Sequence, residues 1–70
     1  MVRQSMLKVL KRKGLKMTPQ RLAIIEALAA MRDLHPSAGA VYREARKIRK
    51  GLSLSTTYAT LNQLSAQGII

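Results

Sequence analysis

The segment Met17-Thr18-Pro19 marks the most definite helix start in this chain. A threonine just before a helix can accept a hydrogen bond from a backbone N–H of the first turn. Proline is favoured at the first helical position, because its missing N–H costs no hydrogen bond there. Met17 and Leu22 occupy the two positions of a hydrophobic staple. This pattern predicts a helix over residues 19–31. Its expected buried residues are Leu22, Ile25, Leu28 and Ala29.

Three more amphipathic segments accompany this helix. The spacing of their apolar residues predicts helices over residues 2–13, 38–50 and 53–67. Expected caps are Ser37 and either Ser53 or Ser55, and expected stops are Gly14, Gly51 and Gly68. The sequence therefore predicts an all-α domain of about four helices. The residues expected to be buried in these three helices are Met6, Leu7, Leu10, Val41, Ala45, Ile48, Leu54, Thr57, Leu61, Leu64 and Ser65.

The composition argues against an enzyme. Seventy residues make one domain at most, and the absence of cysteine excludes disulfides and thiolate zinc sites. The only aromatic residues are Tyr42 and Tyr58, so the core must be aliphatic. The three acids are not paired with one another, and acid–base or nucleophilic chemistry needs at least two positioned titratable groups. No apolar run reaches the length of a membrane span and no signal peptide is evident, so we expect a cytoplasmic protein.

The charge is divided unevenly along the chain. Thirteen Lys and Arg against three Asp and Glu give a net charge of +10, yet residues 51–70 carry no charge. Such a balance predicts a polyanionic partner. The last two predicted helices, with a short glycine-containing break, form a helix-turn-helix pattern. In such motifs the N-terminal part of the second helix meets base edges. The residues expected there are Ser55, Thr56 and Ala59, with Tyr58 alongside.

Other polar residues are candidates for DNA contact. Gln20 and Arg21 fall in the exposed first turn of the helix over 19–31. A cation at that position opposes the helix dipole, so a phosphate partner would explain Arg21. Asn62 and Gln63 face outward two turns into the last helix, where each remains a candidate for a base edge.

Three blocks of the sequence resemble the ferric uptake regulator family. They are Gly14-Leu15-Lys16-Met17-Thr18-Pro19-Gln20-Arg21, then His35-Pro36-Ser37-Ala38 with Val41-Tyr42, then Ser53-Leu54-Ser55-Thr56-Thr57-Tyr58 with Leu61-Asn62 and Gly68-Ile69-Ile70. The resemblance implies that residues 1–70 form a single winged-helix DNA-binding domain whose wing hairpin is missing or truncated. We expect the C-terminal metal-binding dimerisation domain of such regulators to be absent from this chain.

The resemblance also implies a function. It implies a metal-responsive transcriptional repressor that binds A·T-rich inverted repeats of double-stranded DNA as a dimer, with dimerisation requiring the absent domain. By the same resemblance Tyr58 lies at the major groove, and Lys16 reaches the adjacent minor groove, whose potential is strongly negative in A·T-rich DNA. The full set expected to contact DNA is Lys16, Gln20, Arg21, Ser55, Thr56, Thr57, Tyr58, Ala59 and Asn62.

His35 matches a regulatory metal ligand of the family. A transition-metal site needs roughly four to six donors, and the others would come largely from the absent domain. We therefore expect no tight cofactor binding by this chain, and zinc, iron or manganese binding only in a full-length relative.

Three alternatives stay open from the sequence. The chain could bind nucleic acid through charge alone, which equal affinity for shuffled duplexes would indicate. It could be a helical fragment that pairs with another protein. Its first helix could act as a basic membrane-surface helix, although the other helices and their caps favour a folded domain without a membrane partner.

Overall fold

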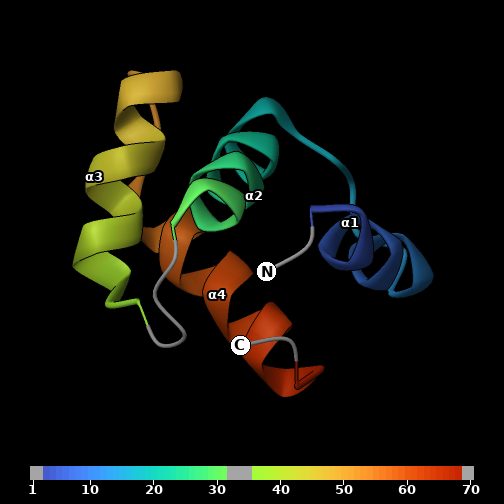
Figure 1. Ribbon diagram of the computed structural model, residues 1–70. Helices are drawn as coiled ribbons and strands as arrows, with labels where there is room; N and C mark the ends of the chain where they lie inside the picture. The colour runs from blue at the N-terminus through green and yellow to red at the C-terminus, as the bar shows by residue number, and fades with distance from the viewer. Residues whose placement is uncertain (1–2, 32–35, 69–70) are drawn as a thin grey trace.

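The computed structural model describes residues 3–31 and 36–68, and within these ranges its regular secondary structure consists of helices joined by turns. The helices are α1 (Arg3–Arg12), α2 (Pro19–Ala30), α3 (Ala38–Ile48) and α4 (Leu54–Ala66). No strand occurs in the described ranges, and the predicted all-α fold of about four helices is confirmed. α2 packs against all three other helices, and α1 and α3 lie on opposite sides of it (Figure 1).

Three helices begin at the hydroxyl caps that the sequence predicts. The Oγ1 atom of Thr18 accepts a hydrogen bond of 3.2 Å from the N–H of Arg21. Ser37 caps α3 in the same way, and Ser53 rather than Ser55 caps α4. Each cap satisfies a backbone donor that the helix itself leaves without a partner. The starts of these helices are therefore set by local chemistry.

α1 ends in a left-handed glycine turn. Gly14 has φ +69°, a conformation that strains residues with a Cβ atom. The N–H of Leu15 donates to the carbonyl of Leu10 at 3.1 Å, and the N–H of Gly14 donates to that of Lys11 at 3.0 Å. This pair of bonds is the Schellman motif, and it reverses the chain toward α2.

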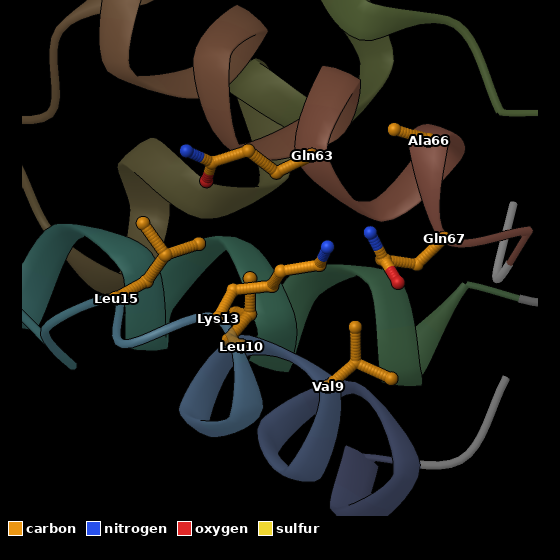
Figure 2. A pocket seen from close by; sticks show the side chains of 7 residues that line it. All are labelled: Val9, Leu10, Lys13, Leu15, Gln63, Ala66 and Gln67. Atoms are coloured by element: carbon orange, nitrogen blue, oxygen red, sulfur yellow. The ribbon is translucent and has the colours of Figure 1, made fainter.

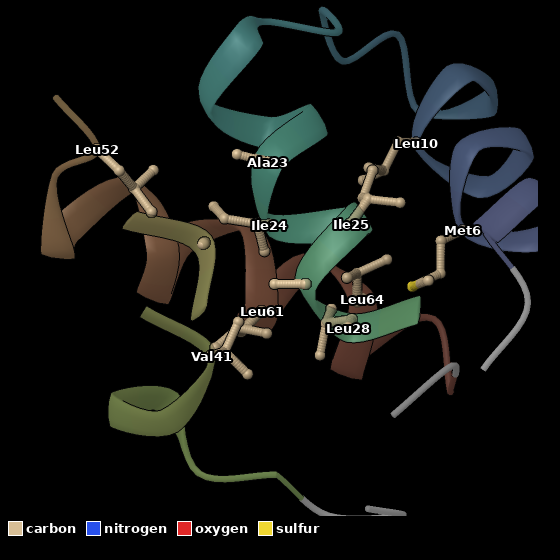
Figure 3. Close-up of a cluster of buried hydrophobic side chains, with 12 residues drawn as sticks. Met6, Leu10, Ala23, Ile24, Ile25, Leu28, Val41, Leu52, Leu61 and Leu64 are labelled. Carbon is tan, nitrogen blue, oxygen red and sulfur yellow. The ribbon is translucent and has the colours of Figure 1, made fainter. Parts of the chain in front are cut away.

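The core is aliphatic, as predicted, and lies around α2 (Figure 3). Five residues of α2 are buried, so this helix is covered on most sides rather than along one stripe. Ile25 and Leu28 are fully buried, while Leu22 and Ala29 are only partly buried. Tyr42 packs against the edge of the core. The buried hydrophobic residues are Met6, Leu10, Ala23, Ile24, Ile25, Ala27, Leu28, Val41, Ala45, Leu52, Leu61 and Leu64.

Three residues predicted to be buried are exposed. Ile48 is 57% exposed and Leu54 is 45% exposed, and Ser65 is also at the surface. Ile48 is the last residue of α3 and Leu54 the first of α4. Helical periodicity gives the direction of a side chain but not how far the neighbouring helix extends. At these two ends no packing partner covers the apolar side chain.

α3 is shorter than predicted. It ends at Ile48 instead of near residue 50, because Arg49 takes an extended backbone (φ −133°, ψ 102°) while its N–H donates to the carbonyl of Ala45. Gly51 therefore lies in the turn rather than stopping the helix. Leu52, which the sequence analysis did not place in the core, is 4% exposed and closes it from this turn.

Candidate nucleic-acid interface

A surface hollow of about 390 Å³ lies where the starts of α2 and α4 meet. Gly14 and Leu15 form part of its lining from the turn after α1. The hollow brings together four of the residues that the sequence predicts to contact DNA, although they come from three segments of the chain. These four residues are Lys16, Gln20, Arg21 and Thr56.

Two hydrogen bonds fix the walls of this hollow. The Oε1 atom of Gln20 accepts a hydrogen bond of 3.4 Å from the N–H of Ser53, which links the first turn of α2 to the cap of α4. The Nη1 atom of Arg21 donates to the carbonyl oxygen of Lys16 at 2.8 Å, which holds the turn before α2. The amide nitrogen of Gln20 and the other N–H groups of Arg21 remain as donors.

The hollow has the electrostatics of an anion site. Residues from the first turns of α2 and α4 line it, and each helix start carries a partial positive charge from the helix dipole. Neither α2 nor α4 has an acidic residue in its first turn, so no local carboxylate offsets that charge. Lys16 and Arg21 add two full positive charges. Phosphate groups are favoured at helix starts of this kind.

A second polar surface continues from the hollow along α4. Ser55, Tyr58, Ala59 and Asn62 are all exposed and are spaced i, i+3, i+4 and i+7, so they form one face of the helix. Tyr58 is 49% exposed. We call these four residues the outer face of α4. It is uncharged and offers hydroxyl and amide groups of the kind that read base edges in a major groove.

Thr57 does not belong to this surface. Its side chain is fully buried, and its hydroxyl donates to the carbonyl of Ser53 at 3.0 Å. The prediction that Thr57 contacts DNA is therefore wrong for its side chain. Gln63 was expected to face outward, but its Oε1 atom is buried at the junction with α1 (Figure 2).

Leu54 is an addition that periodicity alone missed. It precedes Tyr58 by one helical turn and is exposed beside the outer face of α4. Large exposed aliphatic side chains at a polar surface are suited to apolar contacts with a partner. Its position directly after the Ser53 cap was the available signal, since it puts Leu54 at the very end of the helix.

The cations of α3 form a separate exposed surface. The guanidinium carbon of Arg46 lies 5.4 Å from the centre of the Tyr42 ring. Lys47 pairs with Glu44 at 3.1 Å, with both side chains largely in solvent. An exposed pair of this kind contributes little to stability. These cations add to the long-range attraction of a polyanion without lining the hollow.

The described residues do not fit a metal centre. No three His, Cys, Asp or Glu side chains gather anywhere in the described ranges. The carboxylates in those ranges belong to Glu26 on α2 and Glu44 on α3, while Asp33 and the predicted ligand His35 lie outside the described residues. Such a site takes about three or four converging protein ligands, and water can supply the remaining donors. The prediction about His35 thus stays a prediction.

None of the described helices combines the length and the apolar character needed to cross a bilayer.

Comparisons with known proteins identify relatives of the chain. It is 36% identical over 61 residues to a ferric uptake regulation protein homolog of Archaeoglobus fulgidus, covering 87% of this chain and 48% of that protein. It is 38% identical over 61 residues to the ferric uptake regulation protein of Escherichia coli (strain K12), covering 87% of this chain and 41% of that protein. For the Yersinia pestis protein the identity is 40% over 63 residues, covering 90% and 43%. The chain thus spans less than half the length of these relatives.

No solved structure matches the chain. The model of one protein family, described as the ferric uptake regulator family, matches residues 12–70. That range holds the hollow, the outer face of α4 and all three sequence blocks that carry the resemblance. The match is to a family of regulators, which confirms the prediction that the chain is not an enzyme. Since the match covers most of the chain, the protein belongs to the ferric uptake regulator family.

Proposed function

We propose that this chain is the DNA-binding domain of a metal-responsive transcriptional repressor in the cytoplasm. In this proposal the outer face of α4 reads A·T-rich operator DNA, and the hollow beside it anchors phosphates. α3 and α4 are the two helices of a helix-turn-helix, and a winged helix would be completed by residues beyond those described. The names of the relatives support regulation at the family level.

One observation carries the proposal: the positively charged hollow and the uncharged outer face of α4 are adjacent. Thr56 lines the hollow, while its neighbour Ser55 starts the outer face. Phosphate contacts fix the register of a protein on the duplex, and base contacts supply the sequence preference. The hollow would therefore set the depth and direction in which the outer face of α4 enters the major groove.

Individual residues have distinct roles in this proposal. Lys16 is exposed at the rim of the hollow and would reach into a narrow A·T minor groove, where cations are favoured. The Tyr58 hydroxyl and the Asn62 amide would contact base edges or nearby phosphates. Leu54 would contact the methyl group of thymine, which only A·T pairs present in the major groove.

Metal and dimerisation belong to the longer protein in this proposal. The described residues assemble no metal site. In this proposal zinc, iron or manganese would bind to a C-terminal domain, and the relatives are long enough to contain such a domain. A dimer would place two copies of α4 on an inverted repeat. A single domain should bind a half-site weakly and with strong salt dependence.

Fluorescence anisotropy with two labelled duplexes tests this function. One duplex contains an A·T-rich inverted repeat and the other has the same base composition in shuffled order, and both are titrated at low and moderate salt. We expect tighter binding to the inverted repeat at both salt concentrations. Equal affinity that disappears with added salt would instead support non-specific binding by charge.

A further inference from the structure

A cationic turn leads directly into α4. It comprises residues 49–52 and joins the end of α3 to the cap residue Ser53, and we call it the α3–α4 turn. Arg49 and Lys50 in this turn are both exposed. Lys50 lies three residues before Ser53, so the Cα atoms of these two residues are at most about 11 Å apart. The charge of the turn therefore lies close to the start of the helix that carries the outer face.

The backbone of the α3–α4 turn is held at both ends. The N–H of Arg49 donates to the carbonyl oxygen of Ala45 at 2.9 Å, and the N–H of Leu52 donates to the carbonyl oxygen of Arg49 at 3.2 Å. The Leu52 side chain is 4% exposed, so it anchors the turn to the core. Arg49 and Lys50 thus extend from a fixed backbone, which reduces the ordering that binding a partner requires.

Nothing in the neighbouring sequence offsets the charge of the α3–α4 turn. Glu44 is the last acidic residue of the sequence, and its carboxylate pairs with Lys47 at 3.1 Å. Among the described residues neither Arg49 nor Lys50 forms an ion pair with a carboxylate. The two cations are therefore available to an anionic partner. The planar guanidinium of Arg49 is well suited to the oxygens of a phosphate.

The α3–α4 turn and the hollow reach the start of α4 from different sides. The hollow takes its lining from the turn after α1, from α2 and from Thr56, and neither Arg49 nor Lys50 is part of that lining. The chain arrives at Ser53 from α3, which lies on the opposite side of α2 from α1 (Figure 1). The start of α4 thus has cations on both sides.

A helix in a major groove lies between two phosphate backbones, one from each DNA strand. The groove is about 12 Å wide, so groups on either side of such a helix come near different strands. In helix-turn-helix proteins the N-terminal part of the second helix meets the bases. Cations on the two sides of that part are consequently placed to contact the two backbones that border the same base pairs.

We propose that Arg49 and Lys50 bind phosphates of the DNA strand across the major groove from the strand that the hollow binds. This inference rests on the proposed function, because it requires α4 to lie in a major groove. Contacts with both strands prevent the helix from rotating about a single contact. They would therefore fix the outer face of α4 over the bases.

Matched charge variants test whether these two cations contact phosphates. Arg49→Gln/Lys50→Gln removes both of them, and the control Lys8→Gln/Arg43→Gln removes one lysine and one arginine from exposed positions of α1 and α3. The first variant should reduce the slope of log K against log salt concentration by about 2, or about 1 for each lost contact. The control should change that slope much less. Equal slopes for the two variants would show attraction to net charge alone and would overturn the proposal.

Duplexes that carry a single neutral methylphosphonate in place of one phosphate identify the strand. Each position of an A·T-rich half-site is replaced on one strand at a time, and binding is followed by fluorescence anisotropy. For the parent chain we expect several-fold losses of affinity at positions on both strands. Arg49→Gln/Lys50→Gln should cancel the losses on one strand, and Arg21→Gln in the hollow should cancel those on the other. Cancellation on the same strand by both variants would overturn the proposal.

The unmodified duplexes separate this inference from the proposed function. If the inverted repeat is preferred over shuffled DNA and Arg49→Gln/Lys50→Gln binds as tightly as the parent chain, the proposed function stands and the second anchor is refuted. Equal affinity of the parent chain for both duplexes would refute both. Arg49→Lys/Lys50→Arg keeps the two charges and should bind like the parent chain, which separates loss of charge from disturbance of the turn.

Discussion

The side chain of Gln20 at the start of α2 accepts a hydrogen bond from the backbone N–H of Ser53, 33 residues later in the chain. This bond joins the two helix starts that form the hollow. It is exposed and 3.4 Å long, so its contribution to stability is small. Its main effect is to fix the position of α4 relative to the start of α2, where we propose that phosphate binds.

Replacing Gln20 tests this link. Gln20→Ala should lower the free energy of unfolding by less than about 1 kcal/mol, because water can replace an exposed hydrogen bond. Affinity for the inverted-repeat duplex should fall by more than the small loss of stability explains. The reason is that the hollow loses the Gln20 amide donor and α4 is no longer held in position against the start of α2. Urea unfolding and anisotropy measure the two quantities. Gln4→Ala, at an exposed position of α1, serves as the control and should leave both unchanged.

Lys16 is expected to contact a phosphate or the minor groove. Lys16→Ala should weaken binding and reduce the slope of log K against log salt concentration by about 1, because one fewer counterion is released. Lys8→Ala removes an exposed cation of α1 and should change that slope less. Identical salt slopes for Lys16→Ala and Lys8→Ala would mean that Lys16 contributes only non-specific electrostatic attraction to DNA.

The Tyr58 hydroxyl is expected to act in sequence reading. Tyr58→Phe should weaken binding to the preferred duplex by about threefold to tenfold, the range for one lost hydrogen bond, and should affect shuffled DNA less. Tyr42→Phe is the matched control, since Tyr42 belongs to α3 and packs against the core instead of lying on the outer face of α4. An equal loss on both duplexes would contradict base reading by Tyr58.

Leu54 and Ile48 form a matched pair for apolar contact with DNA. Both are exposed, at 45% and 57%, so alanine at either position should change stability little. Leu54→Ala should weaken binding to thymine-containing operator DNA, whereas Ile48→Ala should not. Substituting deoxyuridine for thymidine removes the methyl groups and should abolish the difference between Leu54→Ala and the parent chain. If Leu54→Ala still weakens binding to the deoxyuridine duplex, Leu54 does not act by contacting the thymine methyl group.

Two buried threonines of α4 differ in their hydrogen bonding. The Thr60 hydroxyl is buried without a partner in the described residues, whereas that of Thr57 donates to the carbonyl of Ser53. Thr60→Val should therefore raise the free energy of unfolding by about 1 kcal/mol, since it removes an unsatisfied polar group. Thr57→Val should be close to neutral. Urea denaturation of the two variants tests this order, and equal effects would indicate that Thr60 finds a partner in solution.

The sequence predicted the local features of the fold well. Thr18, Ser37 and Ser53 cap their helices because cap chemistry depends on residues within one turn. Gly14 and Gly68 adopt positive φ after α1 and α4 as expected for helix stops. These features need no knowledge of distant parts of the chain, so periodicity and turn chemistry were sufficient.

The errors arose where distant segments decide the outcome. Ile48 and Leu54 lie at helix ends that no neighbour covers, and Gln63 turns toward α1 rather than outward. Leu52 is buried although it lies in a turn with no helical pattern. The bond between Gln20 and Ser53 joins residues that no local rule relates. Six of the nine residues predicted to contact DNA belong to the last helix. For Thr57 the sequence predicted both burial and DNA contact, and the structure shows that its side chain is buried.

The outer face of α4 has a consequence for how such a domain diversifies. Ser55, Tyr58, Ala59 and Asn62 do not belong to the hydrophobic core, whereas the opposite side of the same helix is fixed by Leu61 and Leu64. Substitutions on the outer face therefore leave the interior undisturbed. If the outer face reads DNA as proposed, a lineage carrying this domain can change the DNA sequence that it prefers through single substitutions there, with little risk of losing the folded state.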